Sequence, residues 1–279
     1  MSTQPEMHIR WKQDSPFTDL FLALKDIASG AAQYRIWIEL AVEDIRSRYL
    51  RSFIGIGWVF VSFAFFVLVK IIIFAPLSGK SLEFFAPYVT VGFFVWTFIS
   101  YSMAEGSTTF ISAKNWIKGS RIPLSVFAYR SVLRNTILTL INGIVAFLII
   151  AYFHRTISTT AFIALGMFMV MLLNAIWVMF FLGALGARYQ DFVHLVSTIM
   201  RIMLFLTPIF WIPEQMGALW DRVLIFNPFA HFLISIRDPL LYDSVPMLSI
   251  TVVGVISGVG LTASLLLFSV ARRRIPFWV

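Results

Sequence analysis

The chain has 279 residues, no Cys and a formal net charge of +8. Hydrophobic residues make up 59% of it and charged residues 13%, whereas a soluble globular domain is about half apolar and about a quarter charged. This composition excludes a disordered chain, a disulfide-stapled secreted domain and an ordinary cytosolic enzyme, which leaves an all-α integral membrane protein. The first 30 residues do not contain a basic stretch followed by an apolar one, so no cleavable signal peptide is predicted.

The N-terminal region changes character near residue 31. Residues 1–30 are mixed and polar, and they predict a cytosolic lead with one short helix. Residues 31–51 place apolar side chains on one side of a helix and charged ones on the other, which predicts an amphipathic helix lying on the membrane surface. This helix ends in Arg46, Arg48 and Arg51. Two interpretations stay open: a solvated helix anchored by its positive charge, or a docking surface for a cytosolic partner.

Six apolar segments are each long enough to cross a bilayer. They cover residues 53–75, 87–109, 124–152, 159–187, 192–212 and 247–270. Sixteen of the 22 Lys and Arg residues fall on the side of the two termini, and four fall on the opposite side. The positive-inside rule therefore predicts that both termini are cytosolic, including a basic tail over residues 271–279. Residues 31–270 are expected to form one transmembrane domain.

The segment 213–246 between the last two predicted spans, here called the outer hairpin, is not an ordinary loop. Pro228 divides it into two short amphipathic pieces, about 215–226 and 229–241. Both pieces are too short to cross the membrane, so they predict interfacial or re-entrant half-helices on the outer side. A lid or gate is one interpretation, and a connector that rests on the membrane is the other.

Arg201 lies near the middle of the fifth predicted span, where an arginine should not face lipid. Helical spacing places it on one stripe with His194, Thr198, Phe205 and Pro208. Such a polar and aromatic stripe favours a pathway for an anionic or sugar-bearing molecule. The alternative is that Arg201 is buried in a helix–helix contact and bonded to backbone carbonyls.

Aromatic residues make up 16% of the chain and are dense in the first span, which contains Trp58, Phe60, Phe63, Phe65, Phe66 and Phe74. Aromatic faces stack on the apolar faces of sugar rings without requiring one particular sugar, as a sliding polymer needs. Ordinary helix packing and membrane-interface belts are the other explanation for these residues.

Catalytic and metal-binding patterns are not found in the sequence. The four His residues are scattered and have no Cys or carboxylates nearby, so no metal site is predicted. Gly79-Lys80-Ser81 has Phe74 where a phosphate-binding loop would begin with Gly, so no nucleotide site is predicted. Glu105 is the best candidate for an acid within the membrane, and this shortage of ionisable groups argues against an ion-coupled transporter.

Four segments, in order along the chain, resemble the ABC-2 type permeases and most closely their polysaccharide-export branch, which includes O-antigen, capsule and teichoic acid exporters. They are Arg48-Tyr-Leu-Arg51-Ser-Phe-Ile-Gly55-Ile-Gly57-Trp58 before the first span, Arg188-Tyr-Gln-Asp191 between spans four and five, Leu206-Thr207-Pro208-Ile209-Phe210, and Asn227-Pro228 with Arg237 in the outer hairpin. The resemblance covers residues 20–270.

This resemblance implies a homodimer in the bacterial inner (cytoplasmic) membrane, in which each subunit pairs with a separate cytosolic ABC ATPase subunit. ATP and Mg would be bound by that partner, so this chain would be a transporter subunit with no cofactor and no catalytic residues. The ATPase would engage the cytosolic loop between the second and third spans as a coupling helix, through Lys114, Trp116, Lys118 and Arg121. A plain positive-inside loop is the alternative. No nucleic-acid partner is expected.

The resemblance also implies a cargo, a lipid-pyrophosphate-linked polysaccharide that leaves the cytosol. Arg46, Arg48 and Arg51 would lie near its entrance, although the same arginines equally suit anionic headgroups of the surrounding membrane lipids. The candidate conduit residues are Trp58, Phe65, Thr198, Arg201 and Phe205, and the candidate outer-gate residues are Trp220, Phe226, Phe229 and Arg237.

Two other functions are weighed against polysaccharide export. The first, in the same superfamily, is a drug or small-lipid exporter, which would have a narrower pocket lined by Met and Leu and no special outer hairpin. The second is a membrane-embedded enzyme such as a lipid-sugar transferase. An enzyme of that kind would cluster acidic or metal-binding residues at one interface, and the sequence has no such cluster.

Overall fold

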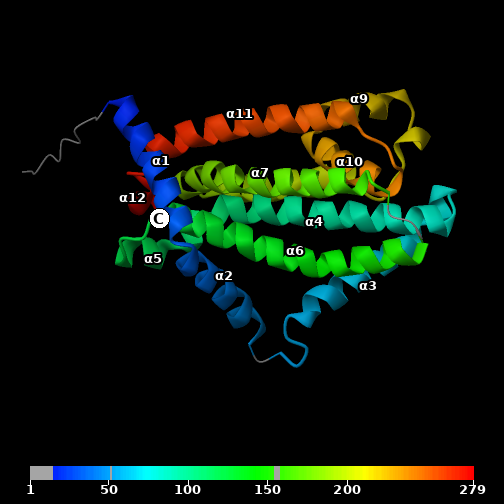
Figure 1. The fold of residues 1–279 in the computed structure, drawn as a ribbon, viewed down its shortest axis with the longest axis horizontal. Coiled ribbons are helices and arrows are strands. Elements are labelled where there is room, and N and C mark those ends of the chain that lie inside the picture. Colours follow the sequence, from blue (N-terminus) through cyan, green and yellow to red (C-terminus); the bar gives the residue numbers. More distant parts are fainter. Residues whose placement is uncertain (1–14, 51, 154–157) are drawn as a thin grey trace, which may run out of the picture.

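The computed structural model describes residues 15–50, 52–153 and 158–279, apart from the side chains of residues 218–221. Within these ranges the protein is helical and contains no strand. Five helices are long and apolar enough to cross a membrane: α3 (Gly57–Phe74), α4 (Leu82–Ser112), α6 (Ser125–Phe153), α7 (Ala161–Arg188) and α11 (Met247–Ala271). They lie roughly side by side in one bundle (Figure 1).

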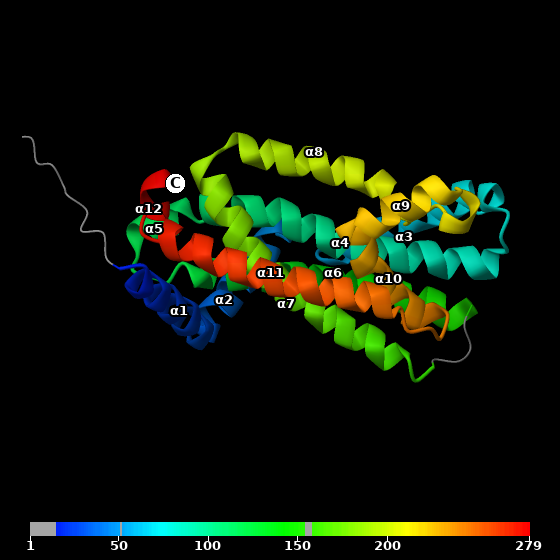
Figure 2. The same cartoon turned by 90° about the horizontal axis from the view of Figure 1, so that it is seen from above.

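The fifth predicted span, over residues 192–212, is shorter than expected. Helix α8 (Asp191–Leu206) has 16 residues and therefore rises only about 24 Å. It ends at Leu206, not at residue 212, because Pro208 has no N–H to donate and disfavours helical geometry at Thr207, whose backbone is extended. Figure 2 shows α8 running along the outside of the bundle.

Side chains from other helices satisfy the backbone where α8 breaks. The hydroxyl of Tyr88 donates to the carbonyl oxygens of Pro208 and Trp211, at 3.2 and 2.7 Å. Arg237 donates to the Pro208 carbonyl at 2.7 Å. Irregular backbone at membrane depth is stable only when its polar groups find partners inside the protein, and these three bonds supply such partners.

Two helices precede the bundle where the sequence predicts one short helix and one amphipathic helix. Helix α1 (Pro16–Ala32) begins with Ser15 as its N-cap and Pro16 in its first turn, both common at helix starts. The chain turns at Gln33, and α2 (Tyr34–Tyr49) follows. Helix α2 buries Ala41 and Ile45 and packs against α6, whereas Tyr34, Ile38 and Val42 are exposed, so its apolar face is covered by protein only in part.

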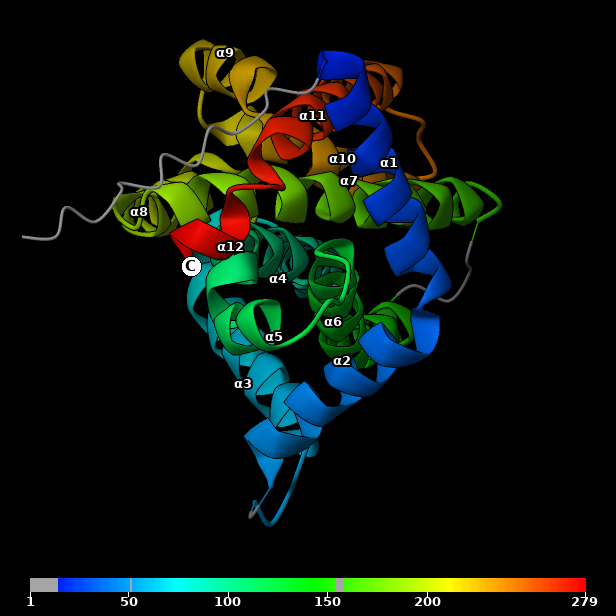
Figure 3. The same cartoon turned by 90° about the vertical axis from the view of Figure 1, so that its left-hand side faces the viewer.

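Helix α4 lies at the centre of the bundle in the end-on view of Figure 3. It contributes the largest set of buried residues among the described helices. It packs most extensively against α7 and α6. The approach of α7 is close because a Cβ at Gly186 would lie 1.8 Å from the carbonyl oxygen of Ser107. Only glycine fits this helix crossing, which is typical of membrane helix packing.

The short helices lie at the two ends of the bundle. Helices α1, α5 (Lys114–Gly119) and α12 (Ile275–Trp278) lie at one end, and α9 (Ala218–Phe226) and α10 (Pro228–Leu241) lie at the other (Figure 1). The remaining short elements are 3-10 turns at Pro76–Ser78 and Pro213–Gln215.

Candidate functional site

A cavity of about 660 Å³ lies between α2, α3, α4 and α6, with Leu204 of α8 at its edge. We call it the aromatic cavity. Its ring-bearing lining residues are Tyr49, Trp58, Phe63, Phe66, Phe93, Trp96 and Tyr101. Phe66 and Phe93 meet edge to face, with ring centroids 4.9 Å apart. The volume is in the usual range for a ligand-binding cavity, about 300–1,000 Å³.

The opposite wall of the aromatic cavity is polar. Asn135, Leu138 and Asn142 of α6 line it at helical spacing, and we call these three residues the amide wall. Asn135 is 1% exposed and Asn142 3% exposed. Neither atom of the Asn135 amide has a hydrogen-bond partner within the described part of the chain, and Oδ1 of Asn142 also has none. This wall is not among the sites predicted from the sequence, although two Asn residues seven apart in an apolar span were a visible signal of it.

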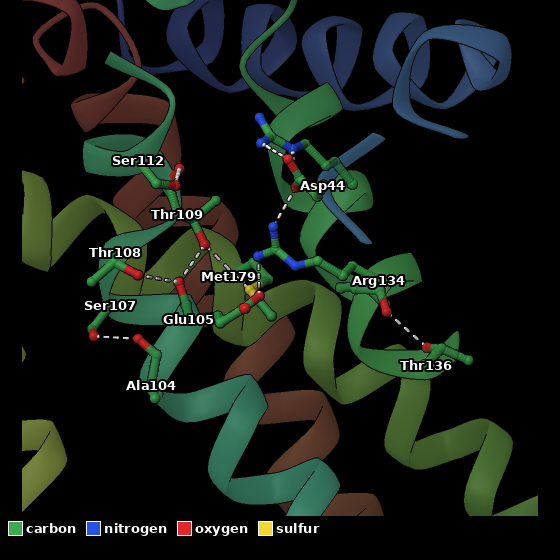
Figure 4. A network of polar contacts seen from close by, with 12 residues as sticks. Asp44, Ala104, Glu105, Ser107, Thr108, Thr109, Ser112, Arg134, Thr136 and Met179 are labelled. Carbon is green, nitrogen blue, oxygen red and sulfur yellow. Dashed lines mark hydrogen bonds and ion pairs between the residues drawn. The ribbon is translucent and has the colours of Figure 1, made fainter. Parts of the chain in front are cut away.

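An ion-pair network borders the end of the aromatic cavity nearer α1, α5 and α12, where Glu105 lines the cavity. Asp44 of α2 accepts from Arg130 and Arg134 of α6, and Arg134 also binds Glu105 of α4 (Figure 4). Two acids therefore balance two arginines. The sequence identified Glu105 as a lone acid, whereas the structure pairs it with Arg134.

The three arginines expected at an entrance have different positions. Arg48 lines the aromatic cavity and makes no hydrogen bond or ion pair with the residues that the structure describes. Arg46 is also exposed but is not among the lining residues. Arg51 lies outside the described residues. One free guanidinium therefore points at the cavity.

The candidate conduit residues fall in three places. Trp58 lines the aromatic cavity, whereas Phe65 is exposed on α3 and outside that lining. Thr198, Arg201 and Phe205 form an exposed stripe on α8, in which Arg201 donates to the Thr198 hydroxyl at 3.2 Å. This stripe is uncovered by other helices of the described chain and does not line the aromatic cavity.

The coupling candidates lie at the end of the bundle that the charge pattern predicts to face the cytosol. Lys114, Trp116 and Lys118 of α5 are exposed, and so is Arg121 just beyond it. A second cavity of about 490 Å³ separates the segment after α5 from α1 and the C-terminal tail.

Asp26 of α1 connects the start of α6 to the C-terminal tail at this end of the bundle. Its carboxylate accepts from the backbone N–H groups of Leu124 and Ser125, at 3.4 and 3.0 Å, and from Nε of Arg272 at 2.9 Å. The start of α6 and the basic tail are thus held by one buried acid. The sequence did not indicate this role.

Hydrogen bonds of Asn227 explain why α9 ends and α10 begins at Asn227-Pro228. Oδ1 of Asn227 accepts from the N–H groups of Phe229 and Ala230 and caps α10. Its Nδ2 donates to the Leu206 carbonyl and the Thr207 hydroxyl, at 3.1 and 3.0 Å. This single side chain therefore ties the hairpin to the end of α8.

The candidate gate residues differ in exposure. Phe226 is exposed at the end of α9, and Phe229 packs edge-on against Trp96 with centroids 5.9 Å apart. Arg237 is 4% exposed, with its guanidinium 4.0 Å from the ring centroid of Tyr88. The side chain of Trp220 lies outside the described residues. Arg237 therefore stabilises the broken end of α8 in this conformation.

Comparisons with known proteins show the family to which the chain is similar. The family model described as "ABC-2 type transporter" matches residues 37–241. The chain is 21% identical over 235 residues to the O-antigen export system permease protein RfbA of Myxococcus xanthus, which covers 80% of this chain and 89% of the relative. Two proteins of the same name from Klebsiella pneumoniae are each 22% identical, over 210 and 228 residues, covering 74% and 78% of this chain and 80% and 86% of theirs.

Proposed function

The chain belongs to the ABC-2 type transporter family and is a multi-pass membrane permease subunit, and from this premise we propose that it exports a lipid-pyrophosphate-linked polysaccharide. The aromatic cavity carries the proposal, because rings on one wall and amides on the other suit sugar, which has both apolar faces and hydroxyl edges. The names of the relatives, which denote O-antigen export, support the same cargo.

The energy for export would come from a separate ATPase subunit that binds ATP and Mg. The exposed, basic and aromatic face of α5 supports docking of that partner. In this proposal both termini are cytosolic, residues 31–270 form the transmembrane domain, and the protein lies in a bacterial inner membrane. Helices α9 and α10 would then be half-helices on the outer side, acting as a gate beside the exit.

Two copies of the chain would form the conduit. The exposed stripe of Thr198, Arg201 and Phe205 on α8 supports this arrangement, since a cation at mid-helix is costly against lipid but suitable against an aqueous path. Arg48 would meet the pyrophosphate at the cytosolic entrance, because a guanidinium binds phosphate oxygens with two parallel hydrogen bonds.

Export of a drug or small lipid is the second candidate. It is favoured by a separate apolar cavity of about 240 Å³ between α4, α7, α10 and α11, whose lining includes Met103, Met171 and Phe232. This cavity is smaller than the aromatic cavity and lies behind α4, away from Arg48.

A deletion strain that keeps the ATPase tests the proposal. Surface and cytosolic polysaccharide are measured without the gene, with the wild-type gene restored, and with Trp58→Ala restored. We expect polymer to accumulate inside the deletion strain, to return to the surface with the wild type, and to return only in part with Trp58→Ala. Unchanged surface glycan in the deletion strain would remove the polysaccharide as cargo and favour a small amphiphile.

A further inference from the structure

We propose that the amide wall is a binding site for the hydroxyl groups of an uncharged sugar unit, with Asn135 and Asn142 as the specificity-determining residues. This proposal deepens the function proposed above and rests on it for the link to export. The site itself rests on unpaired buried amides that face aromatic rings.

The side-chain amides of Asn135 and Asn142 are buried and carry atoms without a hydrogen-bond partner among the described residues. A buried amide without partners destabilises a fold, so most buried polar side chains are hydrogen-bonded. Asn135 leaves its carbonyl oxygen and its NH₂ group unpaired, and Asn142 leaves its carbonyl oxygen unpaired. By contrast, Thr97 lines the same cavity but donates to the Phe93 carbonyl of its own helix at 2.7 Å. The amide wall therefore retains buried donors and acceptors that are free, whereas the Thr97 hydroxyl is paired within its own helix.

The type of free group selects the ligand. An amide both donates and accepts, and a sugar hydroxyl does the same, so each Asn can bind one or two hydroxyls in either direction. The facing rings of Trp58, Phe66 and Trp96 supply apolar faces for the C–H side of a sugar ring. Asn135 and Asn142 are seven residues apart, about 10.5 Å along the helix axis, a gap that the two side chains and their hydrogen bonds of about 2.9 Å can span to one hexose.

The charged side chains that line the aromatic cavity favour a neutral sugar unit at the amide wall. Two charged side chains line the cavity, Arg48 and Glu105, both toward its cytosolic end. Glu105 is paired with Arg134, so Arg48 is the one unpaired cation among the described residues of the lining. When Arg48 binds the phosphate end of the ligand, a uronic acid at the amide wall would be buried without a counter-charge, which is costly. Arg48 serves the phosphate end of a ligand and not its sugars.

Binding of a simple probe tests the site. The full-length protein in lipid nanodiscs is titrated with radiolabelled octyl glucoside, and octyl glucuronide serves as the anionic comparison. Asn135→Leu and Asn142→Leu keep the side-chain volume and remove the amide, and Thr136→Val is the matched control because that hydroxyl donates to the Val132 carbonyl of its own helix. We expect the glucoside to bind better than the glucuronide and each Leu variant to weaken glucoside binding about tenfold.

Thermal unfolding separates a ligand site from a structural one. If the amides are unpaired until a sugar binds, Asn135→Leu keeps or raises the unfolding temperature while it lowers glucoside binding. If a buried water instead satisfies them as part of the fold, Asn135→Leu lowers the unfolding temperature and leaves glucoside binding unchanged, which overturns the proposal. Equal binding of glucoside and glucuronide overturns the claim of neutrality.

Measuring glycan export in the deletion strain beside glucoside binding distinguishes failure of the amide-wall proposal from failure of the polysaccharide-export proposal. If the wild-type gene restores surface glycan and the two Leu variants restore it fully while binding glucoside normally, the amide wall is refuted and polysaccharide export stands. If the deletion has no glycan phenotype but glucoside binding still depends on Asn135, polysaccharide export is refuted and the sugar site stands.

Discussion

Nε of Arg130 on α6 lies 2.6 Å from Oδ2 of Asp44 on α2. A helix with the composition of a membrane-surface helix is therefore bonded to the first turns of a spanning helix. Arg134 extends the connection to Glu105 on α4, so three helices meet in one charge-balanced network at the mouth of the aromatic cavity (Figure 4).

Asp44→Asn should destabilise the protein. The substitution leaves Arg130 and Arg134 to share Glu105, and removing one partner of a buried ion pair costs about 3–5 kcal/mol. We expect the lower end of that range because the side chains of Asp44, Arg130 and Arg134 are still 12–18% exposed to solvent. Thermal unfolding in nanodiscs measures the effect, with Glu43→Gln as the control because it is exposed on the same helix. An equal change in both variants would show that the network contributes little.

Arg48→Gln should lower export, and Arg46→Gln should not. Both residues are exposed on α2 and both substitutions remove one positive charge, but only Arg48 lines the aromatic cavity. Losing a charge-assisted hydrogen bond to the pyrophosphate corresponds to about a tenfold loss. Surface polysaccharide in the restored deletion strain is the measurement. Equal losses from the two variants would instead indicate that the arginines act on membrane lipids.

Arg201→Ala should impair export while leaving the subunits assembled. Arg201 is exposed on α8 and bonded to Thr198 of the same helix, so its removal breaks no contact between helices of the described chain. Surface polysaccharide and cross-linking of the dimer are measured together, with Ile202→Ala as a control on the same helix. Loss of the cross-linked dimer would show that Arg201 is a packing residue.

The contacts of Asp243 predict that stability depends on pH at the α9 and α10 end of the bundle. Hydroxyls of Ser158 and Thr160 donate to its carboxylate at 2.6 and 2.8 Å and lower the pKa of that group below its usual value. A lowered folded-state pKa adds stability above the unfolded pKa, about 3.9, and this stability is lost as the pH falls through the folded pKa. The wild type should therefore lose more stability than Asp243→Asn on acidification from about pH 5 to about pH 3. Parallel unfolding curves for the two proteins would contradict the role of these hydroxyls.

Several features were predictable because they depend on local sequence. Apolar segments of bilayer length predict spanning helices wherever they occur, and the structure has five helices of that kind. The short pieces around Pro228 were predictable because proline ends a helix and Asn227 caps the next one. The family resemblance was visible in ordered motifs, and the family match over residues 37–241 confirms it.

Other features depend on which helices become neighbours. The end of α8 at Leu206 is stable because Tyr88 and Arg237, more than 100 and about 30 residues away in sequence respectively, reach the Pro208 carbonyl. The spacing along the chain shows that Arg130 and Arg134 share one helix face, but it does not show that Asp44 and Glu105 lie opposite them.

The sequence alone determined that this is a helical membrane protein, roughly where its helices begin and end, and which family it resembles, because hydropathy, helix capping and proline act over a few neighbouring residues. The tertiary structure alone decided that Trp58 and Arg48 share a cavity with Asn135 while Phe65 and Arg201 do not. It also decided that Arg237 is buried. These outcomes depend on the rotation and packing of whole helices, and side-chain partners far apart in sequence set both.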